Sequence, residues 1–569
     1  EPDFQALAVA ETTRSIRRLN TMARESISLE DPGLLRASRV AVVLRGCGSL
    51  LRDSKGSAET FEQSRPVGQI DAFISHNWST SPRQKWMVLA IYFNFSLAVS
   101  VALVLMVVCF GLTIFGVLPC VEFEHEGMVM GNSGVSSLFV GSAAMLLTLF
   151  FGRGVAARFG LSGPMVFLDK TCIHQTDPEL KMRGIKSLPA QLIHSSSVVA
   201  VYTETYLQKV WTVYELASVL TLHPDVTLVV LPLFVTKLVI LGALVYPIRF
   251  AAVLFLKTDA TGSWGNDLSR YGFDTVLFPV YLLFAMVLRG WAKERLRIQH
   301  TVSHFDLRSA TCALESDRAL VKDNIVSFVR AFEYVTEVTE ASSDEEALAA
   351  FNALVHKKVP RALTESFGCT GMPHLFLLAT LVGSVGRCLD SISSLLRHHA
   401  DTSEILRMSF CVTTLYASWL PNNLALMSGV LSRRTELGAV SEVLLVTLSA
   451  LGTVFFNLAG KEALLTVSHQ AAKLNTLLAW QTYAFALFII VSFGMTYGLF
   501  FYPRGLKPIV FNCSRRCCGR PRRKVNLQAM SQADTAPNTS ASDEEEHGED
   551  DESDSLADSG DSISMTSES

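Results

Sequence analysis

The sequence predicts an α-helical polytopic membrane protein that carries a small cytoplasmic α/β domain with a parallel sheet. Of its 569 residues, 49% are apolar, and they cluster in long runs, which is typical of a chain embedded mostly in lipid. Short strand and helix patterns lie on both sides of the first pair of apolar runs. The soluble domain is therefore expected to be interrupted by a membrane hairpin.

Eight segments are candidate membrane spans, because a bilayer core of about 30 Å requires roughly 20 apolar residues in a helix. The strongest are residues 87–118, 134–151 and 477–501. The weaker ones are residues 238–256, 276–288, 375–385, 409–431 and 443–458.

Basic residues predict the orientation, since Lys and Arg close to a span are retained on the cytoplasmic side. With eight spans, all the basic flanks fall on one face. They are Arg83, Lys85, Arg153, Arg158, Lys293, Arg295, Arg297, Arg433, Arg434 and residues 515–524. Both halves of the interrupted domain and both termini are therefore expected in the cytoplasm. The membrane in which the chain resides is not predicted.

The interrupted domain is predicted to alternate strands and helices. Residues 71–75 are short, apolar and preceded by Gly68, and Pro82 begins a helix that continues into the first span. Further strands are expected at residues 165–168, 198–202 and 226–234, and helices at residues 182–194 and 207–222.

These segments resemble the Toll/interleukin receptor (TIR) family. The matching pieces are Asp71-Ala-Phe-Ile-Ser75, Val166-Phe-Leu-Asp169, Arg183-Gly184, Tyr206 and Trp211-x-x-x-Glu215-Leu216. The last is similar to the Trp-Cys-x-x-Glu-Leu signature of plant-type members, with Thr212 in place of the cysteine. The resemblance implies a flavodoxin-like fold, although the fifth strand and last helix of the family have no obvious position here. The open side of the sheet is expected to be covered by membrane helices or by residues 295–367.

One function that the resemblance implies is NAD hydrolysis, with Glu215 as the catalytic carboxylate and NAD as a substrate rather than a cofactor. A carboxylate beside the ribose can stabilise an oxocarbenium-like centre or act as a nucleophile. The implied substrate-binding residues are Phe73, Ser75, His76, Asn77, Trp78, Asp169 and Trp211. The alternative interpretation is that Glu215 pairs with a nearby base and that Trp211 is a core aromatic residue.

The second implied function is protein interaction, and this is the interpretation that we favour for the whole chain. The domain would self-associate or bind other TIR-like domains, partly through the loop at residues 171–180. Attachment to the bilayer raises the effective concentration of such domains without new contacts.

A channel or transporter with a TIR-like regulatory domain is the third alternative. Polar residues near membrane depth are often functional. Here they are Arg249, His374, Arg387, Pro421, Asn422 and Asn423. They form no paired acidic relay, which makes transport the least favoured of the three.

The chain divides on this basis into successive regions. They are the N-terminal cytoplasmic region (1–69), the split TIR-like domain (70–86 and 153–234), the hairpin inserted in it (87–151), a second transmembrane pair (235–292), a cytoplasmic helical segment (293–371), a four-span bundle (372–502), a basic juxtamembrane segment (503–527) and an acidic tail (528–569).

The composition of the ends predicts their partners. The basic cluster that begins at Arg515 and ends at Lys524 is expected to contact anionic lipid. The acidic, Ser-rich tail is expected to be disordered. No metal site is predicted, because Cys172 and His174 are too few and too close together. No basic, aromatic-interleaved patch for nucleic acid is found.

Overall fold

The computed structural model describes residues 29–494 with gaps. The gaps are residues 30, 126–127, 162, 224–225, 259–277, 313–314, 332–341, 368–371, 432–436, 475–489 and 492–493. The chain divides into the units Glu1–Val510 and Phe511–Ser569, and every described residue belongs to the first. The basic segment, the acidic tail and nearly all of the predicted span 477–501 lie outside the described residues.

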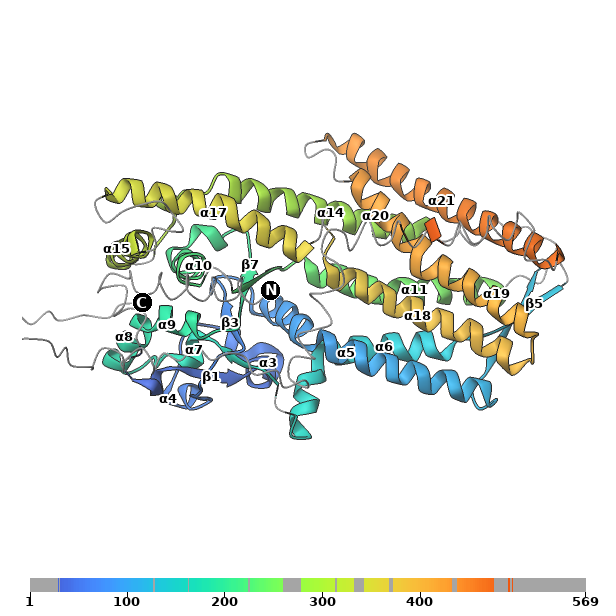
Figure 1. The fold of residues 1–569 in the computed structure, drawn as a ribbon, viewed down its shortest axis with the longest axis horizontal. Coiled ribbons are helices and arrows are strands. Elements are labelled where there is room, and N and C mark those ends of the chain that lie inside the picture. Colours follow the sequence, from blue (N-terminus) through green and yellow to red (C-terminus); the bar gives the residue numbers. More distant parts are fainter. Residues whose placement is uncertain are drawn as a thin grey trace, which may run out of the picture. The chain divides into compact units, whose positions relative to one another are not determined.

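Six of the described strands form one sheet, in the order β2-β1-β6-β3-β7-β8. Strands β1, β3 and β7 of this sheet are labelled in Figure 1. The strands are β1 (Arg36–Arg39), β2 (Ser64–Pro66), β3 (Ala72–Ser75), β6 (Met165–Phe167), β7 (Ser197–Tyr202) and β8 (Thr227–Pro232). The last four are parallel to one another, and β1 is antiparallel to both β2 and β6. If the parallel strands β3, β6, β7 and β8 are numbered 1 to 4 along the chain, they lie in the sheet in the order 2-1-3-4. This is the flavodoxin-like order.

The four predicted strands of the interrupted domain are confirmed, and the sheet extends further than expected. Strands β1 and β2 come from the N-terminal region, residues 1–69, to which the sequence assigned no strand. Both strands are short and mostly polar. Backbone pairing holds β1 in the sheet, where Ser38 pairs with Ser64 of β2 on one side and with Val166 of β6 on the other. These strands contain too few apolar residues to form the periodic pattern from which a strand is predicted.

Both faces of the sheet are buried, as expected for parallel strands. On one face Ile74 and Val199 pack with Val88 and Leu89, at the start of the helix that enters the hairpin. On the other face the Phe73 ring stacks on Phe167 with centroids 4.4 Å apart. The alternation of side chains along each strand therefore builds two cores from one sheet.

The helices of the domain differ from the prediction at two points. The loop expected at residues 171–180 is shorter, because a short helix, α7 (Asp169–Cys172), covers its beginning and α8 (Pro178–Lys186) covers its end. The single helix predicted over residues 182–194 is two helices, α8 and α9 (Leu188–Ile193). Pro189 has no N–H to donate to Ile185, so a continuous helix would lose a hydrogen bond there. The helix expected at residues 207–222 is α10 (Val210–Leu222), preceded by the turn η3 (Tyr206–Gln208).

Five described helices are long and apolar enough to cross a membrane. They are α5 (Pro82–Ile114), α6 (Ser136–Arg158), residues Val235–Ala252 of α11 (Val235–Thr258), α18 (His374–Arg397) and residues Ala439–Phe456 of α21 (Ala439–Leu474). They include the predicted spans 87–118, 134–151, 238–256, 375–385 and 443–458. The predicted span 375–385 is part of a much longer helix than the sequence suggested.

Two predicted spans are not among these five. Residues 276–288 overlap the start of α14 (Phe278–Ser303), whose second half is polar. Residues 409–431 are divided into α19 (Thr402–Thr413), the π-helical η6 (Thr414–Trp419) and α20 (Leu420–Leu431). Pro421 cannot donate a backbone hydrogen bond, which disturbs the regular helix just before it.

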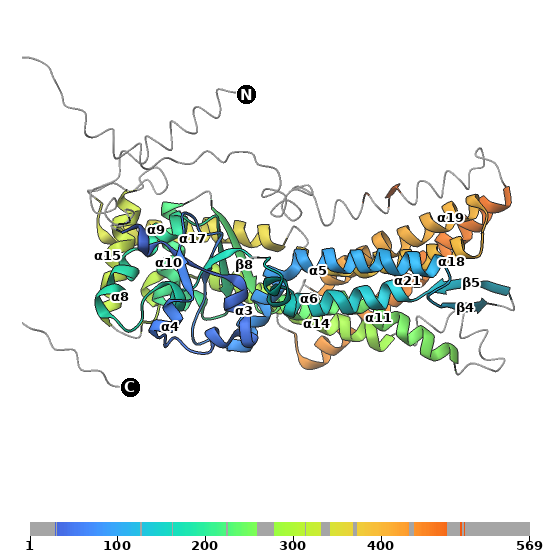
Figure 2. The ribbon, with the colours of Figure 1, turned by 90° about the horizontal axis from the view of Figure 1, so that it is seen from below.

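Polar contacts join the membrane helices to one another. The Asn94 side chain links α5 to α6, because it donates to the Leu149 carbonyl (2.8 Å) and accepts from the Arg153 N–H (2.8 Å). The Asp390 carboxylate on α18 accepts the first N–H groups of α6, from Ser137 and Leu138, both at 2.9 Å. Figure 2 shows α5 and α6 side by side, with the β4–β5 ribbon (Cys120–His125 and Met128–Gly134) at their ends.

Helices from the segment 293–371 cover the sheet beyond β8, which is one of the two alternatives expected from the sequence. The Tyr214 ring of α10 stacks on Phe328 of α15 (Glu315–Ala331) with centroids 6.0 Å apart. The N–H of Val230 in β8 donates to Ser366 of α17 (Asp344–Phe367) at 3.3 Å. In the described part of the sheet, a helix thus occupies the edge where a fifth strand would lie.

Candidate functional site

The candidate site lies where strands β3 and β7 end. In an open sheet of the order 2-1-3-4, ligands bind outside the carboxyl ends of the strands, at the point where the strand order reverses. That point lies between β3, which ends at Ser75, and β7, which ends at Tyr202. The residues that follow each strand therefore converge at one edge of the sheet.

Three side chains form a hydrogen-bonded cluster there, which we call the switch-point cluster: Ser75, Tyr206 and Glu215. The Ser75 hydroxyl donates to Glu215 Oε2 at 2.5 Å and lies 2.6 Å from the Tyr206 hydroxyl. When Glu215 is ionised, the single hydroxyl proton of Ser75 goes to the carboxylate, and Tyr206 is then the donor in the second contact. The Thr212 hydroxyl lies between the backbone carbonyls of Tyr206 and, at 2.9 Å, Lys209, and its single proton is shared between them, which holds the turn in place.

Burial changes the acidity of this cluster. It raises the pKa of Glu215 to about 8, and the nearby charge of Asp169 adds to the increase, while the Ser75 hydrogen bond opposes it. Burial likewise raises the pKa of the Tyr206 hydroxyl, and the adjacent Glu215 raises it further. At neutral pH the larger fraction of Glu215 is protonated, so it can act as an acid or a hydrogen-bond donor.

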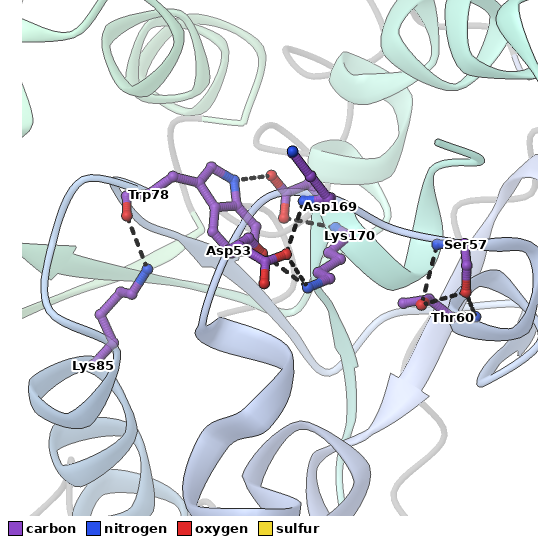
Figure 3. Close-up of polar contacts among 8 residues, drawn as sticks. Asp53, Ser57, Thr60, Trp78, Lys85, Asp169 and Lys170 are labelled. Atoms are coloured by element: carbon purple, nitrogen blue, oxygen red, sulfur yellow. Dashed lines mark hydrogen bonds and ion pairs between the residues drawn. The ribbon is translucent and has the colours of Figure 1, made fainter. Parts of the chain in front are cut away.

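A second group lies beside the first, on the loop after β3 and at the start of α7 (Asp169–Cys172), which follows β6. Figure 3 shows Trp78, Asp169 and Lys170 of this group. The indole N–H of Trp78 donates to Asp169 Oδ2 at 2.8 Å, and the N–H of Lys170 donates to Asp169 Oδ1 at 2.7 Å. The His76 ring packs edge-on against Trp78, with centroids 4.5 Å apart. Burial lowers the pKa of His76 to about 4, so its imidazole is neutral at physiological pH.

Two lysines border the Trp78 side chain. Lys170 forms an ion pair with Asp53 (3.0 Å), which lowers the pKa of that carboxyl. Lys85 lies over the Trp78 ring, 4.7 Å from its centroid, and contacts the Asn77 carbonyl at 3.4 Å. Both ammonium groups are almost fully buried, although each belongs to a residue type that is usually exposed.

The residues predicted from the sequence separate into three groups. Ser75 and Glu215 are in direct contact, and His76, Trp78 and Asp169 form the neighbouring group. Asn77 completes that loop, because its Nδ2 donates to Thr205 Oγ1 at 2.9 Å.

Phe73 and Trp211 lie away from the cluster. The Phe73 side chain is fully buried in the core against Phe167. The indole N–H of Trp211 donates to Asp317 of α15 at 3.0 Å, and its ring packs edge-on against Tyr214. Trp211 therefore attaches α10 to the covering helices.

The sequence did not identify Lys85, Lys170 or Asp53 as parts of this site. From the sequence, Lys85 is only one of the basic residues close to a span that predict the orientation of the chain in the membrane. The one available signal for Lys170 was its position next to Asp169, after an apolar strand. Nothing local indicated Asp53, since it reaches Lys170 from a distant part of the chain.

Among the described residues, no group of three or more His, Cys, Asp or Glu is placed to hold a metal ion. No protein-family model, curated protein or solved structure matches this chain.

Proposed function

We propose that this protein is a membrane-anchored, TIR-like signalling and protein-interaction module. One observation carries the proposal: the connection between the parallel strands β3 and β6 is the membrane hairpin α5–α6 itself. In an ordinary domain of this type the connection is a short surface helix. Here the apolar hairpin is part of the sheet domain rather than an attached anchor.

Helix α5 provides the mechanical link. It runs from Pro82 to Ile114, and its first turns, with Val88 and Leu89, pack beneath the sheet. Lys85 in the same helix contacts the carbonyls of Asn77 and Trp78, at 3.4 and 3.5 Å. A displacement of the hairpin is therefore transmitted to the loop that follows β3.

Signalling would follow from association of the sheet domains on the cytoplasmic side. The basic flanks of the spans support that orientation. Confinement to a bilayer raises the effective concentration of domains that meet through their exposed loops and helices. Helix α8 offers an exposed apolar side chain for such contact, Met182.

Energy transfer between labelled full-length copies in liposomes tests this proposal. We expect transfer to rise with protein density more steeply than a non-associating membrane protein allows, and Met182→Glu to reduce the rise. The matched control is Leu320→Glu, which introduces the same charge at an exposed leucine of α15. Transfer no greater than random encounter predicts would reject the interaction module.

NAD hydrolysis is the second candidate, and the contact between Ser75 and Glu215 at the switch point favours it. In this reaction water replaces nicotinamide at the ribose carbon of NAD, giving ADP-ribose, nicotinamide and a proton. A carboxylate held beside that carbon stabilises the positive charge that develops there. Since the pKa of Glu215 is about 8, the ionised fraction that performs this role increases as the pH approaches 8.

Nicotinamide release from NAD by the full-length protein, reconstituted densely in liposomes, tests the second candidate. We expect release by the wild type and loss of release in Glu215→Gln. The variant Glu179→Gln, at an exposed glutamate of α8, should retain full activity. Absence of release from a correctly oriented and dense sample would remove the enzyme and leave the interaction module.

A further inference from the structure

Two histidine side chains, His300 and His304, lie together on the exposed surface at the end of helix α14. The centroids of their imidazole rings are 4.1 Å apart, and the ring planes are inclined by 22°. Neither residue belongs to the switch-point cluster or to the group beside it. Imidazole is the commonest metal ligand in proteins, so the pair is a candidate for a metal ion.

The backbone places the two rings on one face of the helix. Helix α14 ends at Ser303, and the N–H of His304 still donates to the His300 carbonyl at 3.1 Å. Side chains four residues apart in a helix are neighbours, with about 5–6 Å between their Cβ atoms. Histidines at this spacing supply two of the ligands in helical zinc sites.

The hydrogen bonds of His304 determine which of its nitrogen atoms can bind a metal. Its Nδ1 lies 2.9 Å from the His300 carbonyl and 3.0 Å from the Ser303 hydroxyl. A carbonyl oxygen only accepts, so Nδ1 carries the proton. In the neutral imidazole, Nε2 then keeps its lone pair. The contact at Nδ1 also fixes the ring, as the outer hydrogen bonds of metal-binding histidines do.

The arginines nearest to this pair along the chain have carboxylate partners. Arg297, which precedes the pair by one turn, forms an ion pair with Glu204 at 3.0 Å. Arg308, which follows the pair, forms an ion pair with Glu345. Each of these positive charges is therefore compensated, which lowers their repulsion of a cation bound between the two rings.

We propose that His300 and His304 together bind one divalent ion of the late first-row transition metals, such as Zn²⁺. Both Nε2 atoms are ligands, and water fills the remaining positions. A rotation of the exposed rings about their Cβ–Cγ bonds turns both nitrogens toward one ion. Imidazole suits Zn²⁺, Ni²⁺ and Cu²⁺, whereas Mg²⁺ and Ca²⁺ prefer oxygen ligands.

The number of ligands indicates what kind of metal site this is. Structural zinc sites have four protein ligands. In the part of the chain that the structure describes, no group of three or more His, Cys, Asp or Glu is placed to hold a metal ion. With two protein ligands, the ion exchanges with solution, and its occupancy follows the concentration of free metal.

An ion bound here would also affect the sheet domain, through the loop that follows α14. Thr311 in this loop donates to the Gln208 carbonyl at 2.6 Å and accepts from the Val210 N–H at 3.2 Å. Gln208 belongs to the turn η3, which also contains Tyr206 of the switch-point cluster. The metal therefore stabilises the end of a helix that one short loop connects to the cluster.

The test uses Cu²⁺ as the probe, because its electron spin reports how many imidazoles are bound. Untagged full-length protein in detergent receives one equivalent of Cu²⁺, and the spin-echo modulation from the remote imidazole nitrogens is recorded. We expect the pattern of two bound imidazoles in the wild type and of at most one in His300→Gln and in His304→Gln. In a calorimetric titration with Zn²⁺, each substitution should weaken binding by about tenfold or more, since even the loss of an outer hydrogen-bond partner has an effect of this size.

A matched control removes a histidine elsewhere. His399 is exposed at the end of α18, and its backbone is left-handed, with φ at 54°. Asn tolerates this conformation, so the control is His399→Asn. It should leave both the copper pattern and the Zn²⁺ affinity unchanged. Since His300 and His304 are exposed, their variants should have a Tm close to that of the wild type in the absence of metal.

Three results would overturn the proposal. The first is the pattern of a single imidazole in the wild type. The second is an unchanged Zn²⁺ affinity in both His300→Gln and His304→Gln, which would place the ion at other residues. The third is equal affinity for Mg²⁺ and Zn²⁺, which would indicate a site made of oxygen ligands.

Discussion

Substitution of Glu215 by Gln should remove a pH dependence from the stability of the sheet domain. The pKa of this carboxyl is about 8 in the folded protein, against an ordinary value of 4.5. Between these values the folded protein holds a proton that the unfolded chain has released. The contribution of this carboxyl to the free energy of unfolding is complete below about pH 4.5, and it is lost as the pH rises through 8.

The size of the effect follows from the same two values. While the two states differ by one proton, the free energy of unfolding falls by about 1.4 kcal/mol per pH unit. From pH 6 to pH 9 the total is about 2 to 3 kcal/mol, because the slope fades above pH 8. For a domain of this size, that corresponds to a decrease in Tm of about 5 to 10 °C.

The assay is thermal unfolding of the full-length protein in nanodiscs, followed by tryptophan fluorescence at pH 6 and at pH 9. Gln keeps an acceptor for the Ser75 hydroxyl and has no proton to lose, so Glu215→Gln isolates the titration. The wild type should lose about 5 to 10 °C more than this variant. Glu179→Gln should behave as the wild type. Equal decreases in the wild type and Glu215→Gln would refute the reasoning.

Three other predictions concern stability. Ser75→Ala should lower the free energy of unfolding by about 1 to 3 kcal/mol, because Glu215 and Tyr206 both lose their partner; a Tm equal to that of the wild type would contradict this. Asp390→Ala should cost about 1 kcal/mol, since two N–H groups at the start of α6 lose their acceptor, whereas Asp390→Asn should cost less; denaturant titration in detergent can compare them. Arg289→Met should destabilise by about 3 kcal/mol, and adding Glu442→Gln should restore part of that loss; an additive double variant would show that the pair is not coupled.

The parallel strands could be predicted because each is a short apolar run between polar segments. The buried run Val198–Val201 is the clearest case, since strands that are covered on both faces need apolar side chains at every position. The N-terminal strands could not be found in this way. Ser38 in β1 is buried, but its hydroxyl is bonded to Thr171, which lies far along the chain.

Hydropathy located the five candidate spans of the described residues but not their full lengths. The predicted span 375–385 stops where Arg387 and Asp390 begin a polar stretch, yet α18 continues to Arg397. The basic side chains of this stretch find partners in the hairpin: Arg387 donates to Ser133 at 2.7 Å, and Arg397 donates to the Leu118 carbonyl at 2.9 Å. A count of apolar residues cannot include charges whose partners lie in a distant part of the chain.

The candidate site was predictable in part, for a related reason. Glu215 and Ser75 could be named because they belong to the segments that resemble the TIR family, and the resemblance implies their roles. Their direct contact depends on the order in which the strands lie, which the sequence does not state. The pairing of Lys170 with Asp53 depends on the unexpected N-terminal strands, which bring that region alongside β6.

The membrane hairpin between β3 and β6 also sets an order of events during synthesis. Both neighbours of β3 in the sheet, β6 and β7, emerge from the ribosome only after the hairpin. Until β6 and β7 have been synthesised, β3 has neither neighbour to pair with, and both of its edges remain open to other chains. The sheet can therefore be completed only after both helices of the hairpin have left the ribosome. A copy that stops within the hairpin presents an unpaired apolar strand, and such exposed strand edges make unfinished chains prone to aggregation.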